Sequence, residues 1–131
     1  MRKLLHHIVG GDKAHQLDVQ VQDEPGQGNA CHKYGIYGFH TKGNPSDPTS
    51  DETSLIILFQ NGPIWDSGSV NGITHEALLA VLIDRLECFQ SGPYKSNHNA
   101  EALAAIHLAL HHLQARTHER IARGVEGTHQ I

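Results

Sequence analysis

Apolar and polar residues follow different periods in the two halves of this chain, and the change falls near residue 70. Residues Leu17–Gln22 alternate apolar and polar positions, as a half-buried strand does. Lys33–Phe39 and Ser54–Gln60 predict two more strands, and the last is apolar enough to be covered on both faces. The polar loop Gly43–Glu52 is expected to be mobile. The first half therefore predicts a small antiparallel sheet.

The second half carries helical periodicity in two segments. Thr74 is a predicted N-cap, and the first helix ends where Ser91, Gly92 and Pro93 follow each other. A second helix is expected from about residue 97 to 123, with a seam of apolar residues at Leu103, Ile106, Leu110 and Leu113. Together the helices predict a long antiparallel hairpin whose second helix projects past the first. Because such an end is commonly covered by another subunit, the expected fold class is α+β and oligomeric.

Composition limits the size of the core. With 131 residues, 38% hydrophobic and 5% aromatic, the chain is expected to form a single domain over 1–131, β-rich to about residue 70 and helical from about 71. So thin a core favours burial of apolar surface between subunits. The two cysteines, Cys31 and Cys88, have no metal-type spacing and predict reduced thiols. No membrane-spanning run and no targeting segment is expected.

Positive charge is concentrated near the end of the second predicted helix. Arg116, Arg120 and Arg123 are four and three residues apart, which places them on one stripe of a helix that Gly124 ends. Stacked arginines favour an anionic partner, and a net charge of -4 favours a small phosphorylated ligand over a long nucleic acid. The alternative is a solvated helix face whose cations are stabilised by the helix dipole.

The segment between the two predicted helices offers a second kind of contact. A nucleotide base could stack on Phe89 or Tyr94, and the amide of Asn99 could read its edge. The alternative is that Phe89 belongs to the core and Asn99 only begins a helix.

Twelve histidines raise the question of a metal. His107 and His111 have a spacing that can bind zinc on a helix, but no third ligand lies nearby in the sequence. We therefore expect no metal and no cofactor. The absence of a convincing nucleophile motif favours a binding protein over an enzyme.

Several segments taken together resemble one family, the phage Thoeris anti-defence sponges of the first type, whose helical hairpin is shared with a phage anti-CBASS nucleotide sponge. The resemblance runs in order through most of residues 16 to 128. Its segments are DEPGQGNACHKY (23–34), FQNGPI (59–64), VNGITHEALLAVLIDRL (70–86), FQSGPYKSNHNAEALAAIHLALHHLQART (89–117) and RIARGVEGT (120–128).

The resemblance implies a phage protein that binds and sequesters glycocyclic ADP-ribose, the signal of bacterial TIR-domain enzymes, without cleaving it. It implies action in the cytoplasm of the infected bacterial host, no membrane partner, and homo-dimers or homo-hexamers with pockets at the dimer interface. By the same resemblance Phe89 would stack on the adenine and Asn99 would hydrogen-bond the ligand. Arg116 and Arg123 would hold the diphosphate, with Arg120 as a further contact.

Three other functions are weighed against this one. The first is a sponge for cyclic di- or trinucleotide CBASS signals, the second a nucleotide hydrolase that uses a metal at His107 and His111, and the third a structural phage protein. The chain departs from the family pattern at Asn97-His98, at His112, at Cys31 and in the loop Gly43–Glu52. The first departure removes one possible phosphate contact.

Overall fold

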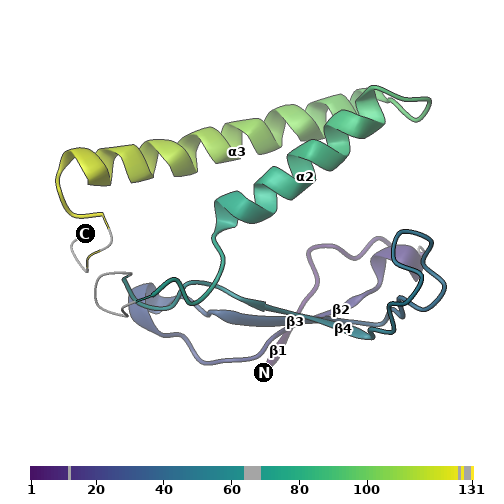
Figure 1. Cartoon of the computed structure of the whole chain (residues 1–131), viewed down its shortest axis with the longest axis horizontal. Helices are drawn as coiled ribbons and strands as arrows, with labels where there is room; N and C mark the ends of the chain where they lie inside the picture. The colour runs from purple at the N-terminus through teal and green to yellow at the C-terminus, as the bar shows by residue number, and fades with distance from the viewer. Residues whose placement is uncertain (12, 64–68, 127, 129–130) are drawn as a thin grey trace. The chain divides into compact units, whose positions relative to one another are not determined.

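The computed structural model describes residues 1–11, 13–63, 69–126, 128 and 131. It divides the chain into two compact units, Met1–Asn61 and Gly62–Ile131. The first holds the sheet and the second the helices (Figure 1). The α+β class predicted from the periodicities is confirmed. The predicted change of character near residue 70 falls just after residues 64–68, which lie outside the described part of the chain.

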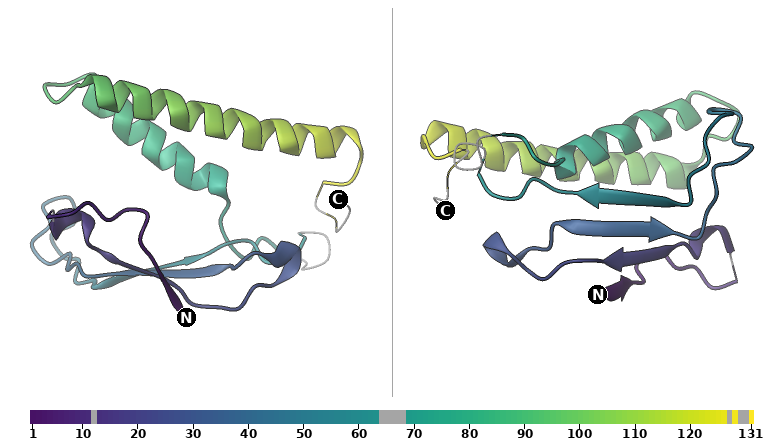
Figure 2. Two further views of the ribbon diagram at one scale, coloured as in Figure 1. Left: turned by 180° about the vertical axis from the view of Figure 1, so that it is seen from behind. Right: turned by 60° about the horizontal axis from the view of Figure 1, so that its bottom comes forward.

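The first unit is a four-stranded antiparallel sheet in the order β1-β2-β3-β4 (Figure 2). Its strands are β1 (Arg2–Leu4), β2 (Asp18–Val21), β3 (Lys33–Tyr37) and β4 (Ser54–Leu58). Two short 3₁₀ turns, Lys13–His15 and Gln27–Asn29, precede β2 and β3. The three predicted strands are confirmed. β1 was not predicted, because three residues carry no readable period and this strand is defined by its pairing with β2.

One expectation for β4 is wrong. It was predicted to be covered on both faces, yet Leu55, Ile56 and Leu58 are 51%, 43% and 50% exposed in the single chain. β4 is an edge strand that pairs only with β3. The apolar run therefore does not mark a central strand.

The polar loop that follows β3 contains regular structure. Residues 41–52 form successive hydrogen-bonded turns, closed by the Thr41 N–H donating to the Glu52 carbonyl at 2.9 Å. The Glu52 N–H donates in turn to Thr41 Oγ1 at 2.8 Å. His40 Nε2 and Asp51 Oδ1 form a hydrogen bond beside this closure.

The second unit is the predicted hairpin of two antiparallel helices, α2 (His75–Gln90) and α3 (Asn97–Ala122). Thr74 caps α2 by accepting the Ala77 N–H at 3.2 Å, as predicted. Ser96 caps α3 by accepting the Asn99 N–H at 3.0 Å. Gly124, at φ +72°, ends α3 in the left-handed conformation that favours glycine.

The core is as thin as the composition predicts. Among the described residues only Val21 in β2 and Ile83 in α2 are buried apolar side chains. α3 has no buried residue. Neither helix in the described part of the chain is both long and apolar enough to cross a bilayer.

Candidate functional site

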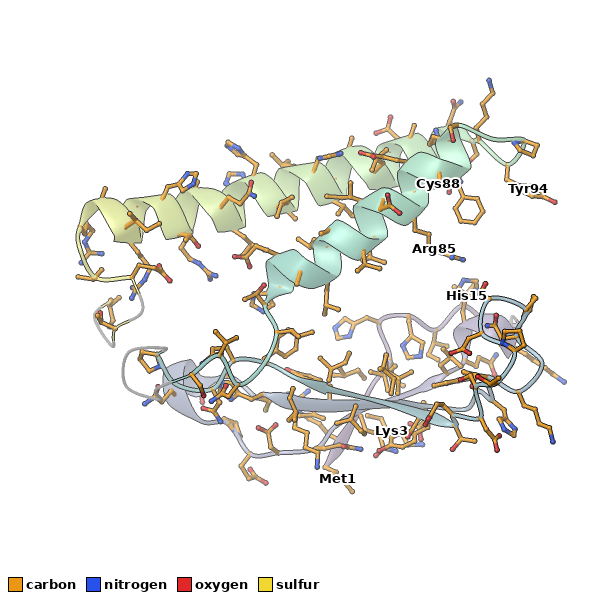
Figure 3. The ribbon with its side chains drawn as sticks, viewed as in Figure 1. Met1, Lys3, His15, Arg85, Cys88 and Tyr94 are labelled. Atoms are coloured by element: carbon orange, nitrogen blue, oxygen red, sulfur yellow. The ribbon has the colours of Figure 1, made fainter. Side chains whose placement is uncertain are left out.

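A pocket of about 300 Å³ lies at the loop end of the hairpin, lined by Arg85, Cys88, Phe89, Gly92, Pro93 and Tyr94. Figure 3 shows Arg85 and Cys88 on the last turns of α2 and Tyr94 on the loop beyond them. Phe89 is half-buried, so one part of its ring is supported by protein and the rest is accessible. An accessible ring in a mostly apolar pocket can stack a planar group such as a nucleotide base.

The loop beside this pocket is held by a reciprocal pair of hydrogen bonds. Gln90 Nε2 donates to the Ser96 carbonyl at 3.1 Å, and the Ser96 N–H donates back to Gln90 Oε1 at 3.0 Å. The predicted residue Asn99 joins this arrangement, because its Nδ2 donates to the Tyr94 carbonyl at 3.4 Å. Phe89 and Asn99 therefore lie at the same end of the hairpin, as a base-binding role requires.

The three predicted arginines lie at the opposite end of α3, and the structure distinguishes them. Arg120 is 22% exposed, and its Nε lies 3.3 Å from Glu126 Oε2. Its guanidinium also donates to the carbonyls of Val125 and Thr128 at 3.0 and 3.2 Å. The side chain of Arg120 thus holds Val125, Glu126 and Thr128 against the end of α3.

The other two arginines are more exposed. Arg123 donates to the Ile131 carbonyl at 2.7 Å. Arg116 is exposed and makes no hydrogen bond or ion pair within the described part of the chain. Its guanidinium keeps its full capacity to bind an anion. Of the predicted phosphate contacts, Arg116 is the most available.

A single chain does not bring the two groups of predicted site residues together. Asn99 and Arg116 are seventeen positions apart on one continuous helix. At about 1.5 Å per residue they are separated by roughly 25 Å. A small nucleotide cannot contact both ends of α3 within one chain.

The histidines and cysteines do not assemble a reactive centre in the described residues. His107 Nε2 lies 3.5 Å from Glu87 Oε1 and so links the two helices. No group of three or more His, Cys, Asp or Glu side chains in residues 1–11, 13–63, 69–126, 128 and 131 is placed to hold a metal ion. Cys31 and Cys88 are free thiols, as predicted.

In the first unit, the sequence DEPGQGN forms a tight loop organised by Asp23. Its carboxylate accepts the N–H of His32 at 2.9 Å and that of Lys33 at 3.2 Å. The hydrogen bond from His32 lowers the pKa of Asp23 below its usual value of 3.8. Asp23 thereby fixes the start of β3.

Arg85 is a pocket residue that was not predicted from the sequence. Its guanidinium carbon lies 5.2 Å from the centre of the Phe89 ring. The two residues are four positions apart on α2, the spacing at which side chains on a helix meet. That spacing is visible in the sequence, but nothing in the sequence alone distinguishes Arg85 from an exposed arginine of the helix surface.

Comparison with known families decides the assignment. The Acb2/Tad1 hairpin domain matches residues 51–118, which is just over half of the 131-residue chain. The chain belongs to the Acb2/Tad1 hairpin family. The matched range contains β4, all of α2 and most of α3, so the family hairpin includes Phe89, Asn99 and Arg116.

A relative of this hairpin protein is Thoeris anti-defense 1 of Bacillus phage SBSphiJ7. The two are 44% identical over 74 residues, which is 56% of this chain and 51% of the relative. The chain therefore spans about half the length of the curated relative it matches.

Proposed function

We propose that this protein is a phage anti-defence sponge that binds glycocyclic ADP-ribose made by TIR-domain enzymes and holds it uncleaved. The observation that carries the proposal is the pair of complementary groups at the two ends of α3. One end has an accessible aromatic ring in a pocket of about 300 Å³, and the other has the unpaired cation of Arg116. Family membership and the name of the phage relative support it.

Each group suits one part of an ADP-ribose ligand. Phe89 stacks on the adenine, and Asn99, held beside the loop, hydrogen-bonds the base. Arg116 and Arg123 bind the diphosphate, which accepts bidentate guanidinium contacts. Arg120 contributes chiefly by shaping the helix end, since its donors already serve the segment after α3.

A complete pocket requires two copies of the chain. If two α3 helices pair antiparallel, the Phe89 end of one copy meets the Arg116 end of the other. Exposed apolar side chains on both helices support such a contact: Val81 and Leu82 on α2, and Leu108 and Ile121 on α3. We propose a homo-dimer, or a homo-hexamer of three dimers, in which the two units of each chain act as one domain.

Under this proposal the protein catalyses no reaction and needs no cofactor. Sequestration works by mass action, so the dissociation constant and the number of sites must together bring the free signal below the effector's threshold. This would take place in the cytoplasm of the infected host, where the signal is made.

Ligand depletion tests the proposal. Purified protein is mixed with glycocyclic ADP-ribose, and the ligand that passes an ultrafiltration membrane is measured. The wild type should deplete the ligand in proportion to its own concentration, and the Arg116→Ala variant should not. Depletion of cyclic di- or trinucleotides instead would establish the CBASS alternative, and depletion of neither would contradict a sponge.

A further inference from the structure

Arg85 and Phe89 form a cation–π pair within the hairpin pocket. The guanidinium carbon lies over the ring, 5.2 Å from its centre. Within the described part of the chain no carboxylate lies within ion-pair distance of Arg85, although Asp84 and Glu87 are close in sequence. The aromatic ring, and not an acid, is therefore the partner that orients this arginine.

The pair limits how a base can bind. The Arg85 guanidinium lies over the Phe89 ring, and both residues line the pocket. The remaining pocket lining comes from Cys88 and from the loop residues Gly92, Pro93 and Tyr94. Figure 3 shows Arg85 on α2 and Tyr94 on the loop that follows this helix. A base that enters this pocket would contact a Phe89 ring that Arg85 already orients.

We propose, on the basis of the proposed function, that Arg85 is a positioning residue for base recognition. It holds the ring of Phe89 in one orientation through the cation–π contact, so that the adenine meets an oriented ring. Preorganisation of this kind strengthens binding because less side-chain freedom is lost when the ligand binds. Arg85 thus acts through Phe89.

A double-mutant cycle tests this dependence. The dissociation constant for glycocyclic ADP-ribose is measured by calorimetry for wild type, Arg85→Ala, Phe89→Ala and the double variant. Arg85→Ala should weaken binding roughly two- to fivefold, the range of an exposed cation–π contact. Phe89→Ala should weaken binding roughly five- to 150-fold, and adding Arg85→Ala to it should cause no further loss.

Two further variants define the contact. Arg85→Lys keeps the cation and should recover part of the affinity, whereas Lys95→Ala removes a nearby loop cation outside the pocket lining and should leave affinity unchanged. The proposal would be overturned if Arg85→Ala left the affinity unchanged. It would also be overturned if Arg85→Ala reduced the affinity equally in the wild-type and the Phe89→Ala protein.

A measurement without ligand separates this proposal from the sponge function. In the free protein, the ring of Phe89 should shift the side-chain proton resonances of Arg85 upfield in NMR spectra, and Phe89→Leu should abolish that shift. An upfield shift in a protein that fails to bind glycocyclic ADP-ribose would refute the sponge and retain the positioning contact. Absence of the shift in wild type would refute the contact itself.

Discussion

Asn99 and Arg116 lie on the same helix but roughly 25 Å apart, because seventeen positions separate them at about 1.5 Å each. Each end of the hairpin therefore holds half of the proposed site. Because of this separation, a mixture of two variants can test whether one pocket combines residues from two chains. A single variant cannot test this.

Co-assembly of Phe89→Ala chains with Arg116→Ala chains should restore wild-type affinity at some sites, which neither variant has alone. In a random mixture of symmetric dimers, half of the dimers contain both variants, and each of these has one intact pocket. About a quarter of the wild-type sites should be recovered. Calorimetry after refolding the equimolar mixture measures this fraction.

The matched control mixes Phe89→Ala with Asn99→Ala, which damage the same half of the pocket. This mixture should recover nothing. If both mixtures recovered the same fraction of binding sites, the pocket would not combine opposite ends of two chains.

Arg116 and Arg120 should respond differently to replacement by alanine. Arg116→Ala should remove ligand binding and change the free energy of unfolding by less than about 0.5 kcal/mol, because the side chain is exposed and unpaired. Arg120→Ala removes the donor to the Val125 and Thr128 carbonyls and should raise amide hydrogen exchange at those residues. Unaltered exchange there would mean that Arg120 does not hold this segment.

A side chain at Gly35 in β3 should displace the ends of the Gln22 and Tyr37 side chains. A Cβ atom there would lie 2.5 Å from Gln22 Nε2 and 2.7 Å from the Tyr37 ring and hydroxyl, which are themselves hydrogen-bonded at 2.5 Å. Gly35→Ala should reduce the free energy of unfolding by about 1–3 kcal/mol, measured by urea denaturation. Gly10→Ala is the control, because nothing lies within 4 Å of its Cβ. Equal stability of the two variants would contradict the steric argument.

Acid should weaken the loop that Asp23 organises. The pKa of Asp23 is lowered in the folded chain by the hydrogen bond from the His32 N–H, so its ionised form is stabilised by folding. This stabilisation is fully present at pH values above the pKa of Asp23 in the unfolded chain. It is lost as the pH falls below about 3.8 and passes through the lower pKa of the folded chain. Urea titrations from pH 7 to pH 2 should show Asp23→Asn less stable than wild type at neutral pH, with the gap closing in acid. A constant gap would show that the charge is not responsible.

Features that depend on residues close together in the sequence could be predicted from it. The helix cap at Thr74 and the glycine stop at Gly124 follow from interactions within a few residues, and both are observed. The strand β1 and the edge position of β4 were not predicted, because both depend on which strands pair. The spacing of apolar residues within a strand does not show which other strand it pairs with.

The candidate site shows the same limit. The arginine spacing was visible in the sequence, but the sequence could not show that Arg120 is engaged by Glu126 while Arg116 is unpaired. Those outcomes depend on the contacts that Val125, Glu126 and Thr128 make with Arg120. The roles of Phe89, Asn99 and the arginines toward a ligand stay predictions.

The most direct test of the sponge proposal is to recover the ligand. Protein is saturated with glycocyclic ADP-ribose, freed of unbound ligand, heat-denatured, and the released material is analysed by mass spectrometry. We predict intact glycocyclic ADP-ribose in stoichiometric amount. A cleaved or linearised product would contradict the account and identify an enzyme.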